Sequence, residues 1–120
     1  VGYRGAGRSG SVSVTFYIYR PEGEFRAIFD QEKRAITSFN AGAAPKRETP
    51  HAIETPAGRI EGRLARFEYA GQGGILGTRL YLFALKRDYV KLRVTHRVED
   101  DALVDGQVAT LLSAIGWPAQ

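Results

Sequence analysis

The sequence contains no cysteine and no methionine. Without cysteine, disulfides, thiolate metal ligands and thiol nucleophiles are all excluded. No apolar run approaches the roughly 18 residues that a membrane-spanning helix needs, and the longest, over residues 80–85, has the length of a strand. Because the chain starts at Val1, we expect that an upstream segment is removed and that the protein is periplasmic or secreted, with a cytoplasmic location as the alternative.

The composition is that of an ordinary globular domain. The chain has 120 residues, of which 43% are hydrophobic and 25% charged, so it can bury a core without disulfides or metal. We therefore predict a single domain over residues 1–120. The net charge of +4 favours anionic partners such as nucleic acid, acidic lipid or an acidic protein surface, although such a charge also serves solubility alone.

Apolar periodicity predicts a strand and then a helix in the first third of the chain. Residues 1–10 are rich in glycine and arginine and are interpreted as a loop or an edge strand. From residue 11 to Pro21 the pattern alternates, with Tyr17 and Tyr19 in the polar phase, which is typical of a half-buried strand. Residues 22–39 show helical spacing. Glu32 falls on the apolar face of this helix, where we expect it to pair with an arginine of the sheet or to lie at a frayed crossing.

The middle of the chain predicts a connection and three strands. Residues 40–56 contain three prolines and little apolar content, which predicts an irregular surface connection. Strands are predicted over residues 59–70, 78–86 and 89–97, with a glycine-rich turn at 71–77. In the first of them the apolar phase flips, which predicts a β-bulge near Ala65. The second is apolar on both faces, as is typical of a central strand.

The last element is predicted to be an amphipathic helix. Asp100 or Asp101 is a candidate N-cap, and Gly116 lies just past the end of the apolar stripe, which comprises Val104, Val108, Leu111, Leu112 and Ile115. The predicted fold is α+β, with an antiparallel β-sheet and two α-helices packed on one face, in the order β-α-β-β-β-α.

Motifs for cofactors, metals and catalysis are incomplete. Residues 5–10 match G-x-G-x-x-G, but a strand follows where a dinucleotide site requires a helix, and residues 71–74 lack the lysine of a phosphate-binding loop. His51 and His96 have no metal-ligand spacing, and no G-x-S-x-G elbow is present. The acidic residues 99–101 are explained by capping of the last helix. We expect no cofactor, no metal and no catalytic residues.

A basic sheet face is the candidate binding site. Residues in one phase of the last strand project to the same side of the sheet, and cations of a neighbouring strand are expected to join them. Aromatic and cationic side chains on a sheet are typical of single-stranded nucleic acid binders, but the exposed side of any antiparallel sheet carries similar residues. The candidate residues are Tyr17, Tyr19, Arg63, Arg66, Lys91, Arg93 and Arg97.

Residues 14–19, 81–85 and 89–95 carry a resemblance to known proteins. Their sequences, VTFYIY, YLFAL and YVKLRVT, resemble strands of uncharacterised exported bacterial proteins. The order of elements resembles the fold of Mog1 and of PsbP, the photosystem extrinsic protein. This resemblance implies a Mog1/PsbP-like fold and a binding or assembly role, with no catalytic motif to carry over. It also implies an N-terminal strand, which only residues 2–7 could supply.

We therefore expect a non-catalytic binding or assembly module that contacts a macromolecular partner, most simply a protein, through its sheet face or loops. One alternative is binding of single-stranded nucleic acid or acidic lipid through the basic, tyrosine-containing face. A second is a small enzyme with a pocket formed by Glu32 and His51 or His96. A third is a structural subunit whose tyrosine-rich face forms an oligomer interface.

Overall fold

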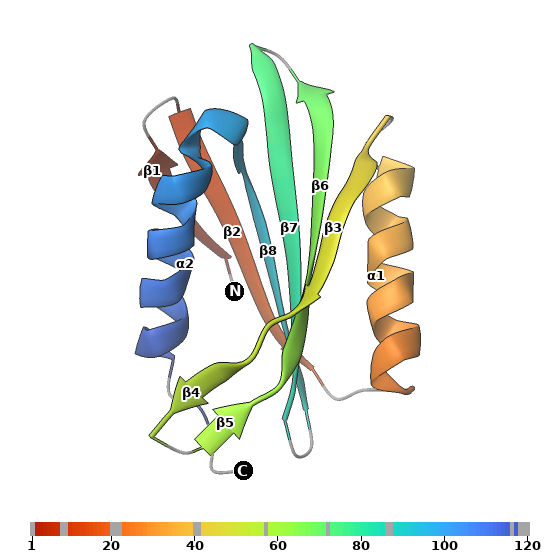
Figure 1. Cartoon of the computed structure of the whole chain (residues 1–120), viewed down its shortest axis with the longest axis vertical. Coiled ribbons are helices and arrows are strands. Elements are labelled where there is room, and N and C mark those ends of the chain that lie inside the picture. Colours follow the sequence, from red (N-terminus) through yellow and green to blue (C-terminus); the bar gives the residue numbers. More distant parts are fainter. Residues whose placement is uncertain are drawn as a thin grey trace.

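The computed structural model describes residues 2–7, 10–19, 23–39, 42–56, 58–71, 73–85, 88–115 and 117, with side chains described for residues 23–38 and, within these ranges, from 42 onward. Within these ranges, eight strands and two α-helices follow one another (Figure 1). They are β1 (Gly2–Gly7), β2 (Gly10–Tyr19), α1 (Phe25–Phe39), β3 (Ala44–Pro50), β4 (Ile53–Thr55), β5 (Gly58–Ile60), β6 (Gly62–Gly71), β7 (Gly74–Ala84), β8 (Tyr89–Arg97) and α2 (Asp101–Ala114), with a short 3-10 helix (Val98–Asp100) before α2.

Six of the strands form one antiparallel sheet. Its order is β1-β2-β8-β7-β6-β3, so β8 and β7 lie in the middle and β1 and β3 are the edges. Strands β4 and β5 form a separate antiparallel hairpin beside it. The predicted α+β class, with an antiparallel sheet and two helices, is confirmed.

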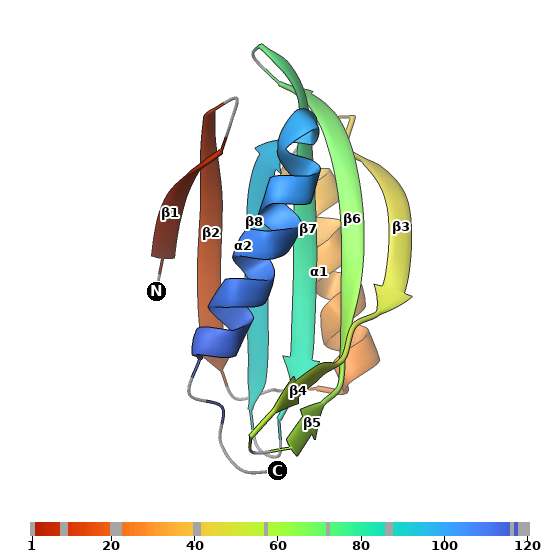
Figure 2. The ribbon, with the colours of Figure 1, turned by 60° about the vertical axis from the view of Figure 1, so that its left-hand side comes forward.

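The two helices cover opposite faces of the sheet, so the prediction that both pack on one face is wrong. Leu80 and Leu82 of β7 pack in one cluster with Phe29 of α1, whereas Tyr81 of β7 packs in another with Val108 of α2. In Figure 2, α2 lies in front of the sheet and α1 behind it. The physical reason is the composition of β7. A strand that is apolar in both phases needs cover on both sides, because alternate side chains point to opposite faces.

The same arrangement explains the phase flip in β6. The register of β6 with β7 runs without a shift from Gly62, opposite Phe83, to Gly71, opposite Gly74, so the predicted bulge near Ala65 is wrong. Both phases of β6 are apolar because Leu64 lies in the α2 cluster and Phe67 in the α1 cluster. The register shift lies instead on the neighbouring strand, between Pro45 and Arg47 of β3.

Residues 40–56, predicted to be irregular, contain strands β3 and β4. Prolines 45 and 50 fit in β3 because it is an edge strand, where one side of the backbone need not donate hydrogen bonds. Residues 2–7, interpreted as a loop or an edge strand, form the opposite edge as β1.

Asp100 is the N-cap residue of α2, but its side chain makes no capping hydrogen bond. The apolar stripe predicted for this helix is confirmed by the burial of Val104, Val108 and Leu112. Gly116, predicted to follow the helix, lies outside the described residues. In the described part of the chain, neither helix has the length and apolar character that crossing a membrane requires.

Candidate functional site

The structure divides the predicted basic residues between two faces. Lys91, Arg93 and Arg97 alternate along β8 with buried residues, and their register partners on β7 place Lys91 and Arg93 opposite Leu82 and Leu80, on the α1 side. Arg63 pairs in register with Leu82 and shares this side. Arg66 pairs in register with Arg79 and lies on the α2 side. The structure therefore brings four of the five predicted cations to one face and places Arg66 on the other.

The α1 side of the sheet is partly covered and its cations have partners. Helix α1 packs on it, and the ion pairs are Lys91–Glu32 at 2.9 Å, Arg63–Glu48 at 2.9 Å and Arg97–Glu99 at 2.9 Å. Arg93 donates to Thr78 Oγ1 at 3.3 Å. For the described residues, the α1 side is therefore partly covered and its charges are largely paired, and its role as a binding face stays a prediction. Tyr17 and Tyr19 pair in backbone register with Lys91 and Tyr89, but their side chains lie outside the described part.

The candidate catalytic residues of the enzyme alternative do not converge. Glu32 lies on the α1 side and pairs with Lys91 of β8, whereas the sequence predicted an arginine of the sheet or a frayed crossing. His51 and His96 lie on the α2 side, each in contact with a different aromatic or cationic neighbour: His51 with Tyr81, and His96 with Arg79, which donates to its Nε2 at 3.3 Å.

A buried arginine joins the sheet to the start of α2. Arg79 of β7 is 1% exposed and donates to Asp101 Oδ1 at 2.6 Å and to Asp105 Oδ1 at 2.7 Å. It also donates to the Tyr81 hydroxyl at 3.0 Å. Arg66 adds a second cation at 3.1 Å from Asp101. Asp101, predicted as a cap, thus holds the helix to the sheet. Desolvation raises its pKa, but the hydrogen bond from Arg79 and the charges of Arg79 and Arg66 together outweigh this effect, so the pKa is lowered.

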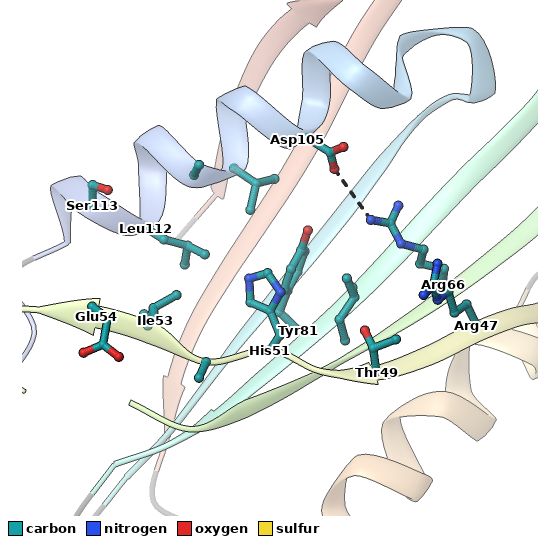
Figure 3. Close-up of a pocket in the computed structure, with 14 residues that line it drawn as sticks. Arg47, Thr49, His51, Ile53, Glu54, Arg66, Tyr81, Asp105, Leu112 and Ser113 are labelled. Atoms are coloured by element: carbon teal, nitrogen blue, oxygen red, sulfur yellow. Dashed lines mark ion pairs between the residues drawn. The ribbon is translucent and has the colours of Figure 1, made fainter. Parts of the chain in front are cut away.

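A hollow on the α2 side lies between α2 and strands β3, β4 and β6 (Figure 3). Its volume is about 710 Å³. Leu64, Val108 and Leu112 give it an apolar floor. At the end nearest the start of α2, Arg66 is paired with carboxylates of α2, and Arg47 makes this end cationic. Asp105 stands across from Arg66, whose Nη2 is 3.6 Å from the carboxylate.

His51 lies in the middle of this hollow. Its ring makes edge-on contacts with Tyr81 and Phe83, at centroid distances of 5.1 and 6.1 Å. Burial, followed by the charges of Arg66 and Arg79, lowers the pKa of His51, so the ring is neutral at pH 7. Within the described part of the chain its ring nitrogens have no hydrogen-bond partner, so they are available to a ligand.

Two smaller hollows extend the first in both directions. One, of about 350 Å³, shares Arg47 and Arg66 with it. It reaches Arg79 of β7 and His96 of β8, next to Asp101 at the start of α2. The other, also of about 350 Å³, shares Glu54, Leu112 and Ser113 with it and reaches Trp117. We call the three hollows together the α2 groove.

Sequence reasoning identified His51 but missed the strand that carries the groove wall. Arg47, Thr49, His51 and Ile53 all line the groove, and their spacing of two residues is that of one face of an extended chain. This alternation could have indicated the strand, but the prolines at positions 45 and 50 obscured it. Among the residues that the structure describes, no three His, Asp or Glu side chains are placed to hold a metal ion.

Comparisons with known proteins bear on the fold alone. No protein-family model matches the sequence, and a search of curated proteins finds no match. The structure is similar to that of a protein of unknown function from Pseudomonas aeruginosa, which is provisionally described as a regulator. The two share 9% sequence identity with a TM-score of 0.71, over 100% of this chain and 83% of that one. At this identity the similarity concerns the arrangement of strands and helices.

Proposed function

We propose that this chain is a non-catalytic binding module that holds an extended segment of a partner protein in the α2 groove. The observation that supports the proposal most is the character of the groove, which combines an apolar floor, a neutral His51 and a cationic end. Binding sites of this kind are mostly apolar, with a few polar groups that orient the ligand.

The length of the groove favours a chain over a compact small molecule. Its three hollows are lined by residues from Asp101 at the start of α2 to Trp117 beyond its end. The 14 residues of α2 rise about 1.5 Å each, giving about 21 Å. An extended peptide rises about 3.3 Å per residue, so a segment of about six residues would span the groove.

The other functions expected from the sequence have less support. Binding of nucleic acid or acidic lipid to the basic face would compete with the ion pairs of Lys91 and Arg63. An enzyme pocket would need Glu32 beside His51, and the two lie on opposite sides of the sheet. The oligomer interface, the export of the chain and its resemblance to the Mog1/PsbP-like fold stay predictions.

The proposal is tested with peptides selected from a random library against the wild-type protein. Trp117 is the one tryptophan in the sequence. It lies at the end of the groove beyond α2, so its fluorescence reports whether a peptide occupies the groove. Ala109, an exposed residue of α2, lines the groove. We expect Ala109→Phe to fill the groove and to weaken peptide binding at least about tenfold, which corresponds to about 1.4 kcal/mol.

Ala114→Phe is the matched control, because Ala114 is an exposed alanine of the same helix that does not line the groove. It should change the affinity less than about twofold, or about 0.4 kcal/mol. The proposal is wrong if the library yields no binding peptide, or if Ala109→Phe binds the selected peptides as tightly as Ala114→Phe.

A further inference from the structure

Most of the Lys and Arg side chains that the structure describes are paired with carboxylates of the same chain. The paired residues are Arg26, Lys33, Arg59, Arg63, Arg66, Arg79, Lys91 and Arg97. Arg34, Lys46 and Arg47 differ from these, because within the described residues none of them lies within 4 Å of a carboxylate. All three line one pocket of about 510 Å³ between α1 and β3. We call these three residues the β3 basic patch.

The irregularity in β3 brings two of these cations together at the edge of the sheet. The register shift between Pro45 and Arg47 inserts Lys46 as an extra residue, and both Lys46 and Arg47 are exposed. Arg47 also stands directly opposite Arg66 in the register of β3 with β6. Like charges in a directly opposed cross-strand pair destabilise a sheet. Arg66 is neutralised by Asp101, whereas the charge of Arg47 is left for an external anion.

The carboxylates beside the patch are already engaged by other cations. Glu48 accepts hydrogen bonds from Lys33 at 2.6 Å and from Arg63 at 2.9 Å. The hydrogen bond from Lys33 is the largest of the effects that lower the pKa of Glu48 to about 2. Asp30 lies 3.2 Å from Lys33 and 3.3 Å from Arg26. Neither carboxylate is therefore available to neutralise the patch.

We infer that the β3 basic patch is a docking site for the Asp and Glu side chains of an acidic segment of the partner protein. The inference rests on the proposed function, because Arg47 lines both the patch pocket and the α2 groove. A partner segment lying in the groove could therefore continue over the edge strand, with its apolar part on Leu64 and its acidic part at the patch.

A peptide fits the patch better than a nucleic acid does. The planar guanidinium groups of Arg34 and Arg47 match carboxylates in a bidentate geometry. Single-stranded nucleic acids bind through bases stacked on exposed aromatic rings as well as through phosphates. The aromatic residue of this pocket, Phe67, is 3% exposed and offers no stacking surface. Exposed cations at a rim act mainly through long-range attraction, so binding should weaken as salt rises.

The test is an NMR titration of the ¹⁵N-labelled protein with a short oligoglutamate peptide at low ionic strength. We expect the amide signals of Arg34, Lys46 and Arg47 to shift most. Oligoglutamine of the same length is the neutral control and should shift none of them. The Arg47→Glu variant should weaken oligoglutamate binding at least about tenfold. Arg59→Glu makes the same charge change at an exposed ion pair on β5 and should weaken it less than about twofold.

Three results would overturn the inference. The first is equal shifts with oligoglutamine, and the second is equal loss of affinity in Arg47→Glu and Arg59→Glu. The third is tighter binding of a single-stranded oligonucleotide than of oligoglutamate at the same signals. If Arg47→Glu does not fold, Arg47→Gln is measured against Arg59→Gln with the same expected direction. Oligoglutamate has no apolar side chains, so Ala109→Phe should not affect its binding. If the patch inference fails this test, the proposal that the α2 groove binds a peptide is still tested separately by Ala109→Phe.

Discussion

Two charged side chains attach the helices to the two faces of the sheet. Arg79 of β7 binds Asp101 and Asp105 of α2, and Glu48 of β3 binds Arg26 and Lys33 of α1. Burying a charge is costly unless its hydrogen-bonding groups find partners. Arg79 meets this condition with carboxylate, hydroxyl, imidazole and carbonyl partners around one guanidinium. Each helix is thus held by apolar packing and by ion pairs on its own side, and α1 has a further ion pair between Glu32 and Lys91 of β8.

Glu48 makes the attachment of α1 depend on pH. Its pKa falls from the ordinary 4.5 to about 2 in the folded protein. A lowered folded-state pKa contributes stability that is complete above pH 4.5 and is lost as the pH falls to about 2. We expect Glu48→Gln to lower the free energy of unfolding by about 1–3 kcal/mol at pH 7, as measured by urea denaturation. The difference from wild type should shrink across this window and vanish near pH 2.

Glu61→Gln is the control for this measurement. Glu61 also pairs with an arginine, Arg59 at 2.7 Å, but its side chain is 68% exposed. Ion pairs so exposed to solvent contribute little to stability. The urea concentration at the unfolding midpoint should be the same for Glu61→Gln and for wild type at every pH. If the free energy of unfolding of Glu48→Gln is still lower than that of wild type by the same amount at pH 2, the loss of stability is not caused by removing the ionised carboxylate.

At the scale of elements, the spacing of apolar residues predicted most of the helices and strands, and the predictions that were wrong have specific causes. The alternation in β8 and the helical stripe in α2 predicted these elements, because most of the apolar residues of each lie on one face. In β6, Leu64 and Phe67 belong to opposite phases, and a single covered face cannot accommodate both. The sequence pattern was therefore interpreted as a bulge, whereas the structure buries one residue under each helix.

Glycines in a strand and in a helix provide a matched test of packing at this scale. A Cβ at Gly62 of β6 would clash with Phe83 Cδ1 and lie 2.7 Å from the Leu82 carbonyl oxygen. We expect Gly62→Ala to destabilise the protein by about 1–3 kcal/mol, since overpacking forces the strand or the ring to move. A Cβ at Gly106 of α2 meets nothing within 4 Å.

Gly106→Ala should therefore stabilise the protein by about 0.5–1 kcal/mol, because alanine favours the helix and restricts the unfolded chain. Urea denaturation of both variants at one pH gives the two changes on a common scale. Loss of stability in Gly106→Ala would indicate that this surface of α2 is covered in solution, and an unchanged Gly62→Ala would contradict the close approach of β6 to Phe83.

At the scale of the molecule, neither the groove nor the patch could be predicted from the sequence, because both depend on strand register. Arg47 and Arg66 are 19 positions apart in the sequence and become neighbours only when β3 pairs with β6. The sequence did predict that Lys91, Arg93 and Arg97 share a side, since they lie on one strand. It could not show that α1 packs on that side, because the order of strands in the sheet determines which helix covers each apolar face.

The order of strands predicts how the molecule opens. Strands β7 and β8 pair on both sides and carry residues of both apolar clusters, whereas β3 pairs on one side only. Amides that are bonded and covered on both faces exchange only when the whole domain unfolds. We expect hydrogen exchange of Leu82 and Leu92 to follow the free energy of global unfolding and its dependence on denaturant. The β4–β5 hairpin, a separate two-stranded sheet, should exchange much faster, through local opening that denaturant hardly affects.

The two helices should differ in the same experiment. Among the described residues, the cluster under α2 contains the larger set of buried residues and is reinforced by the buried Arg79, whereas the ion pairs of α1 at Glu48 are partly exposed. Because local opening begins where fewer apolar contacts hold an element, α1 should open before α2. Equal protection of α1, α2 and β7 would contradict this and would mean that the two faces of the sheet unfold as one cooperative unit.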